Sequence, residues 1–254
     1  MEHHNKTAAI IAIIIGALLL IIIAALISFC EFTAIGYRMS VPHRSSFEKV
    51  DDNVYVNRLD PDEADEKEMM IELIDSAKDR VKEFFGDLEG EDSTVIILCD
   101  DAKMLKKLGG DHDTKTTFFP SKKNYISISP DYCNTDVLAH ELTHAELHSR
   151  LNASALKKLP SWFDEGLAMQ NDYRKQYNED VWAELTDNGK NTVALEDMDE
   201  PEEFYAGTED DRQLRYACAK HEVGNWLERH GQQGLLDLID KLNSGEDFDT
   251  AYNQ

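Results

Sequence analysis

The sequence predicts an α+β domain that follows a single transmembrane helix. Residues 8–29 contain no charged side chain, and at about 1.5 Å of helical rise per residue they cover a hydrocarbon core of ~30 Å. Short β-branched or alternating segments come next, followed by a second half in which apolar residues recur at helical spacing. This order predicts a small mixed-sheet N-terminal lobe and a helical C-terminal lobe.

The first thirty residues are interpreted as a tail, residues 1–7, and a membrane span, residues 8–30. The rival is a cleavable signal peptide, whose apolar region would be about half as long and would end in a small-x-small site. Phe29 stands directly before Cys30, where a lipoprotein signal needs a small residue. We therefore expect an uncleaved anchor without lipidation.

The remainder divides into a juxtamembrane linker over residues 31–50, which lacks sustained periodicity, and a folded domain over 51–254. The first lobe covers about 51–135 and the second about 136–254. Strands are expected at 53–57, 94–99 and 124–129, with a helix over 66–85. We expect 124–129 to be an edge strand, which either pairs with an extended peptide or is simply half-buried. Later helices are expected at 136–151, 161–173, 179–185, 214–230 and 235–242.

The formal net charge of −24 belongs almost wholly to the part after the span. Such a field repels nucleic acid and anionic lipid headgroups, and it favours cationic partners or plain solubility. Beyond Cys30 the cysteines are Cys99, Cys133 and Cys218, an odd number that implies no disulfide framework and leaves a single pair open. None has the C-x-x-C spacing of a cysteine zinc site.

The segment His140-Glu141-Leu142-Thr143-His144 carries the strongest chemical signal. On a helix His140 and His144 lie one turn apart on the same face, so both imidazoles reach one Zn²⁺. Glu141 is turned by roughly 100° from His140, where it can act as general base toward a zinc-activated water. The motif alone arises by chance in some chains, so a third ligand is required.

The third ligand is predicted in the segment Pro160-Ser161-Trp162-Phe163-Asp164-Glu165-Gly166-Leu167-Ala168. Ser161 and Asp164 form a capping-box-like helix start, which places Glu165 in the first turns over an apolar bed. Its carboxylate completes a set of two histidines and one glutamate, the ligand count of a catalytic zinc site. His148 lies a further turn along the His140 face, but three ligands on one straight helix cannot surround one ion, so His148 is placed at the rim.

At these two motifs the sequence resembles the gluzincin metallopeptidases, the thermolysin-like and aminopeptidase-like group, and most of all their small peptidase-like members. In that group a W-x-x-E-G-x-A segment about twenty residues after H-E-x-x-H supplies the third ligand. The resemblance covers about two-fifths of the chain, roughly residues 125–230. It implies a zincin-like fold with the zinc site between the two lobes, His140, His144 and Glu165 as ligands, and Glu141 as general base.

Three features complete or limit the resemblance. Similar families often place a tyrosine on a later helix to stabilise the oxyanion, which points to Tyr216, with Tyr205 as the reserve candidate. Where some members have an acidic residue one turn after the ligand glutamate, this chain has Met169. The G-x-M-E-N motif of aminopeptidases is missing, so endo- and exopeptidase action stay open.

The expected function is that of a membrane-anchored zinc metallopeptidase that hydrolyses peptide or protein substrates. The alternative is a non-catalytic zincin-like binding or scaffold module. Placement of the domain outside the cytoplasm is expected only because a short N-terminal anchor most simply displays a hydrolase there. Arg38 and Arg44 follow the span while Lys6 precedes it, and this charge distribution does not favour that orientation.

Overall fold

The computed structural model describes residues 2–57, 64–99, 101–110, 114–118, 123–129 and 132–254. The strands are β1 (Phe47–Asp51), β2 (Val54–Asn57), β3 (Thr94–Leu98), β4 (Thr114–Phe118) and β5 (Asn124–Ile128). The α-helices are α1 (Glu2–Phe32), α2 (Ala34–Ser40), α3 (Ala64–Phe85), α4 (Ala102–Lys107), α5 (Thr135–Arg150), α6 (Ala153–Leu156), α7 (Ser161–Ala168), α8 (Glu179–Leu185), α9 (Pro201–Phe204), α10 (Glu209–Asn243) and α11 (Phe248–Tyr252). Short 3₁₀ turns are η1 (Val41–His43), η2 (Glu91–Ser93), η4 (Met169–Asn171), η5 (Lys175–Tyr177) and η6 (Leu195–Asp197).

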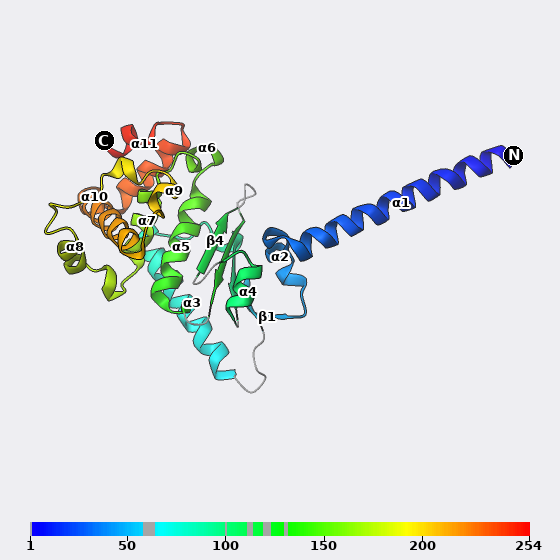
Figure 1. Cartoon of the computed structure of the whole chain (residues 1–254), viewed down its shortest axis with the longest axis horizontal. Coiled ribbons are helices and arrows are strands. Elements are labelled where there is room, and N and C mark those ends of the chain that lie inside the picture. The colour runs from blue at the N-terminus through cyan, green and yellow to red at the C-terminus, as the bar shows by residue number, and fades with distance from the viewer. Residues whose placement is uncertain (1, 58–63, 100, 111–113, 119–122, 130–131) are drawn as a thin grey trace.

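Helix α1 projects away from the rest of the chain as a single rod (Figure 1). Its window Ile13–Phe32 is long and apolar enough to cross a membrane, and none of that window is buried against the protein. Exposed isoleucines and leucines along a helix have no favourable environment in water, whereas lipid satisfies them. By length and composition α1 therefore agrees with the predicted span, and which side of a membrane the domain occupies stays a prediction.

The domain is mixed α/β and contains a five-stranded sheet with the order β1-β2-β3-β5-β4. The three central strands β2, β3 and β5 are parallel to one another. At the two edges, β1 pairs antiparallel with β2 and β4 pairs antiparallel with β5. The prediction that 124–129 forms an edge strand is wrong, because β5 lies between β3 and β4 and all five of its residues are buried. The edge strand beside β5 is β4, which the sequence analysis did not predict.

The two faces of the sheet are covered by different helices (Figure 1). Along β3 the side chains alternate: Ile96 and Leu98 belong to the core under α3 and α5, while Val95 and Ile97 belong to a second cluster under α2 and α4. Because both faces of β3 are buried, its sequence is a nearly continuous apolar run. The larger core continues from the sheet through α5 and α7 to α10 and α11, so the two predicted lobes share one core.

The prediction of a linker over residues 31–50 is wrong. This stretch contains α2, η1 and β1, and its side chains Tyr37, Val41 and Phe47 are buried in the second cluster. These positions are four and six residues apart and lie on three short elements, so no single period reveals them. The folded domain begins near Ala34 rather than at residue 51.

The predicted helices 214–230 and 235–242 are one long element, α10, which starts earlier, at Glu209. Thr208 caps it by accepting a hydrogen bond from the Asp211 amide, and the Asp211 carboxylate accepts one from the Thr208 amide. Gly231 has φ 63° and ψ −171°, values outside the helical region, and marks a break within α10. Glycine adopts such a conformation without steric penalty, which lets the chain continue past the break.

Candidate metal centre

Helix α5 carries the first three predicted site residues. Its N-terminus is capped by Asn134, whose side chain accepts a hydrogen bond from the Val137 amide. The helix runs between α3 and α7 and is buried along most of its length. His140, Glu141 and His144 are 8%, 7% and 7% exposed, so apolar packing rather than solvent fixes their orientation.

Helix α7 carries Glu165, which is also 7% exposed. The predicted capping box is wrong, because Pro160 occupies the N-cap position without a side-chain hydrogen bond and Asp164 points to α5 instead. Gly166 lets α7 approach α10 closely. A Cβ at that position would lie 2.6 Å from the carbonyl oxygen of Ala219, far too close for any other residue.

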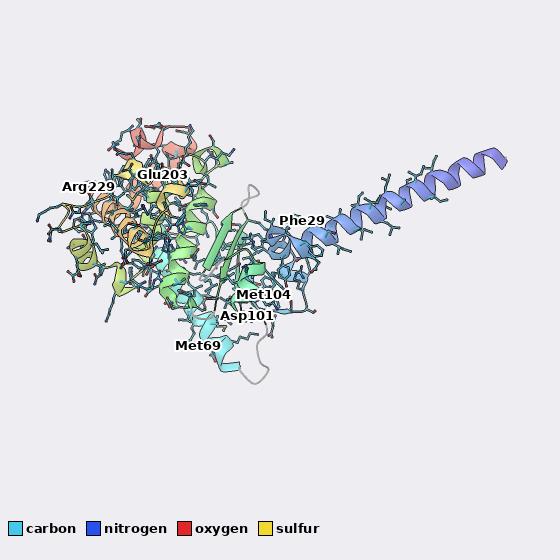
Figure 2. All side chains as sticks on the ribbon, viewed as in Figure 1. Phe29, Met69, Asp101, Met104, Glu203 and Arg229 are labelled. Atoms are coloured by element: carbon cyan, nitrogen blue, oxygen red, sulfur yellow. The ribbon has the colours of Figure 1, made fainter. Side chains whose placement is uncertain are left out.

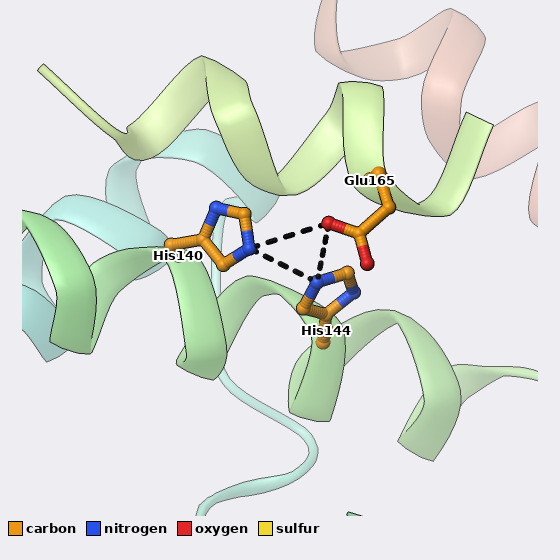
Figure 3. Close-up of side chains that lie close together, drawn as sticks. All are labelled: His140, His144 and Glu165. Atoms are coloured by element: carbon orange, nitrogen blue, oxygen red, sulfur yellow. Dashed lines mark hydrogen bonds and ion pairs between the residues drawn. The ribbon is translucent and has the colours of Figure 1, made fainter. Parts of the chain in front are cut away.

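The structure brings His140, His144 and Glu165 together from these two helices (Figure 3). The two Nε2 atoms are 3.2 Å apart, and each is 3.5 Å from Oε2 of Glu165. Ligand atoms at the ~2.0–2.1 Å distances of tetrahedral zinc are separated from one another by about 3.3 Å. The three atoms therefore fit around one ion without rearrangement.

The hydrogen bonding of the ligand atoms also points to a cation. Oε2 of Glu165 is buried, and apart from its 3.5 Å ion-pair contacts with the two Nε2 atoms it accepts no hydrogen bond from any residue that the structure describes. A buried carboxylate oxygen without a hydrogen bond is rare and energetically unfavourable. Nothing in the geometry distinguishes zinc from other divalent ions that bind imidazole and carboxylate.

Asp164 contacts the ring nitrogen of His144 that does not face Glu165. Its Oδ1 is 2.7 Å from Nδ1 of His144, and its Oδ2 is 2.7 Å from Nε2 of His148. Carboxylates commonly hold the second nitrogen of a metal-binding histidine and so fix the orientation of the ring. His148 thus lies behind the ligand histidine and contacts Asp164. The support that Met169 does not supply comes from the residue directly before Glu165, the predicted ligand.

Nδ1 of His140 has a different environment. The nearest carboxylate oxygen, Oδ2 of Asp172, lies 3.9 Å away, and Nδ1 makes no hydrogen bond to the residues that the structure describes. Asp172 is fully buried and forms an ion pair with Arg174 at 2.6 Å. The two histidines are therefore held unequally, with His144 fixed by a carboxylate and His140 mainly by packing.

Both tyrosine candidates lie at the centre, in a hydrogen-bonded series. The Tyr205 hydroxyl donates to Oε1 of Glu165, the carboxylate oxygen that does not face the histidines. The Tyr216 hydroxyl is hydrogen-bonded to Tyr205, and Glu141 lies near enough to influence it electrostatically. Burial and the Glu165 charge raise the pKa of both phenols, so each keeps its proton as a donor.

The charges of the centre stabilise one another. Burial alone would raise the pKa of the Glu165 and Asp164 carboxyl groups, but the neighbouring histidines hold both pKa values well below their ordinary range. Burial would lower the pKa of His144, and the Asp164 and Glu165 carboxylates raise it well above the ordinary value. The buried carboxylates and imidazoles therefore form a compact cluster at which positive charge is stabilised, the environment that a divalent cation requires.

No protein-family model matches the chain, and no curated protein matches it. The assignment of a function therefore depends on the site itself.

Sequence reasoning missed two parts of this site: Asp164 as the supporting carboxylate of His144, and Tyr205 as the direct partner of Glu165. Asp164 could have been found, because an acidic residue beside a proposed ligand is available to support it. The contact of Tyr205 depends on the loop between α9 and α10, for which the sequence contains no pattern.

Proposed function

We propose that the chain is a zinc-dependent metallopeptidase of gluzincin type, with His140, His144 and Glu165 as ligands and Glu141 as general base. The observation that carries the proposal is the spacing of the three ligand atoms, 3.2 to 3.5 Å apart, around one point on two packed helices. The zincin-like fold is part of the proposal. It is supported by an α5 helix that packs between α7 and a sheet with an antiparallel edge strand.

The donor set favours zinc. Two imidazoles and one carboxylate form one of the ligand sets of catalytic zinc, whereas calcium and magnesium prefer oxygen ligands alone. Structural zinc sites use four protein ligands, mostly cysteines. The described cysteines Cys30, Cys99, Cys133 and Cys218 are free, and none belongs to a His/Cys/Asp/Glu group that could hold a metal.

When bound, zinc would act as a Lewis acid toward a substrate carbonyl and would lower the pKa of a water molecule toward neutrality. The Glu141 carboxylate follows His140 directly on α5, where it can accept a proton from water and donate it to the leaving amine nitrogen. The Tyr216 hydroxyl keeps its proton and, by giving up its hydrogen bond to Tyr205, can donate to a developing oxyanion. Tyr205 would hold the second Glu165 oxygen and so fix the ligand.

A peptide substrate is supported by strand β4. This edge strand pairs with β5 on one side, has no second partner among the described strands, and contacts α5, the helix of the two histidines. An extended peptide can pair with a free strand edge through main-chain hydrogen bonds, whatever its sequence. Strand addition, one of the two alternatives considered for residues 124–129, is thus proposed for β4 instead.

The test uses the full chain in lipid nanodiscs with a mixed peptide library, assayed with zinc and after chelation. We expect cleavage that requires zinc, and E141Q should lower kcat/KM by roughly 10²–10⁴-fold while keeping zinc bound. Zinc content is measured by elemental analysis of the same samples. Zinc binding without cleavage of any peptide would favour the non-catalytic binding module, and absence of both would defeat the proposal.

A further inference from the structure

The segment that follows α1 presents apolar side chains to solvent. On α2, Ile35 and Met39 are 42% and 50% exposed, and their spacing of one turn places them on the same side of the helix. Phe32, at the end of α1, is 86% exposed. The opposite side of α2 is buried, with Tyr37 in the second core cluster. Helix α2 therefore has one face against the sheet and one apolar face without a protein partner among the described residues.

The junction between α1 and α2 is tightly connected. The Arg44 guanidinium donates to the Cys30 carbonyl oxygen at 2.7 Å, forms an ion pair with Glu31 at 3.1 Å, and lies 3.7 Å above the Tyr37 ring. A Cβ at Gly36 would lie 2.2 Å from the Phe29 carbonyl oxygen, so only glycine permits this approach of the two helices. These contacts fix the direction of α1 relative to the sheet.

Helix α4 adds positive charge beside this junction. Lys103, Lys106 and Lys107 are exposed, while Leu105 on the same helix is fully buried in the second cluster. A Cβ at Gly109, just after α4, would lie 3.0 Å from the Ala34 side chain, which places the end of α4 against the start of α2. Figure 2 shows Phe29 and Met104, which lies on α4, on the side of the sheet from which α1 projects.

We propose that α2 and α4 form a membrane-docking face for an anionic phospholipid bilayer. In this arrangement Ile35 and Met39 enter the boundary between headgroups and acyl chains, and the lysines of α4 pair with lipid phosphates. The proposal requires that α1 spans the membrane and is independent of the hydrolase activity. Two separate observations support it: apolar residues continue from the span onto α2, and lysines cluster next to them.

The net charge of −24 predicts repulsion from anionic lipid, and the local arrangement reverses that expectation for this one face. At physiological ionic strength charges more than about 8 Å apart are largely screened. Among the described residues on this face, the three lysines of α4 are accompanied by two nearby carboxylates, Asp101 at the N-cap of α4 and Glu31, which Arg44 pairs, so the local charge is positive and the distant acidic surface contributes little. Docking also places the metal centre away from the bilayer, because α5 and α7 lie beyond the opposite face of the sheet (Figure 1).

The test is amide hydrogen exchange of the full chain in nanodiscs of phosphatidylcholine, or of equal parts phosphatidylcholine and phosphatidylglycerol. We expect exchange in α4 to be about tenfold slower in the anionic nanodiscs at physiological salt, and this protection to disappear at high salt. The triple variant K103E/K106E/K107E should lose the protection. The control K157E/K158E/K190E makes the same change of charge at three exposed lysines elsewhere and should keep it.

Two outcomes separate the docking face from the anchor. Equal exchange of α4 in both lipids, with α1 protected throughout, would overturn the docking face and leave the anchor intact. Rapid exchange along α1 in every nanodisc would show that the span itself is wrong. I35Q/M39Q provides a second check, because it should increase exchange in α2 in both lipids without altering peptide cleavage.

Discussion

The two faces of the sheet differ in what they bury. Under α3 and α5 the core contains the charged groups of the metal centre, including Glu165 and the two histidines, each less than a tenth exposed. Under α2 and α4 the cluster is formed by apolar and aromatic residues such as Tyr37, Ile97 and Leu105, and a single charged group of the described residues on this face, Arg38 of α2, is buried beside it. Burial of charge requires specific partners, whereas apolar burial requires only good packing. The first face therefore gathers buried carboxylates and imidazoles at one point, whereas the second buries apolar side chains and Arg38 next to the start of α2.

We therefore expect substitutions under α3 and α5 to lower zinc affinity. The loss should be larger the closer the substituted residue lies to the metal. The largest effect is expected for E165Q, which keeps the side-chain size and removes the charge. Zinc affinity should fall by more than about 100-fold, beyond the range for residues that only support ligands. The zinc affinity is measured by competition with a chromophoric chelator. E222Q, at a carboxylate on α10 that accepts from Tyr252, is the matched control and should bind zinc normally.

A smaller effect is expected for D164N, because Asp164 orients His144 without contacting the metal. The loss should be about 10–100-fold in zinc affinity. H148Q, which removes only the second partner of Asp164, should produce a weaker loss in the same titration. If D164N bound zinc as tightly as the wild type, the orientation of His144 would have to come from packing alone.

The two tyrosines should separate into different roles. Y205F removes the hydroxyl that donates to Glu165, so zinc affinity should fall by up to about tenfold, the lower limit for supporting residues. Y216F should leave zinc affinity nearly unchanged and lower kcat, because its hydroxyl contacts Tyr205 rather than the ligand. Parallel zinc titrations and steady-state kinetics distinguish the two. If Y216F lowered zinc affinity and Y205F lowered only kcat, the two proposed roles would have to be exchanged.

On the second face we expect no effect on zinc at all. L105A removes a fully buried side chain between α4 and the sheet and should lower the free energy of unfolding by about 2–5 kcal/mol. L138A, on α5 beside the histidines, should cause a similar loss of stability and in addition weaken zinc binding. Thermal unfolding and zinc titration of both variants test the contrast. A loss of zinc affinity in L105A would show that the two faces are coupled.

The sequence predicted those parts of the molecule whose signal is local. The helix predicted over 179–185 agrees with α8, which has the same bounds, and helical spacing predicted that His140 and His144 lie on one face of α5, whereas Glu165 was predicted from its segment. Other contacts between elements were not predictable. Asp164 reaches His144 only because α7 packs against α5, and the close approach of α7 to α10 at Gly166 helps to place α7 there. The edge position of β4 likewise depends on sheet order, which no single strand encodes.

The most direct test of the account is the coordination of zinc in the full chain, measured by X-ray absorption at the zinc edge. We predict one zinc per chain with two imidazole nitrogens and one carboxylate oxygen at ~2.0–2.2 Å, no sulfur ligand, and loss of one oxygen contribution in E165Q. A site with sulfur ligands, or an imidazole signal unchanged when both His140 and His144 are replaced, would contradict the assignment.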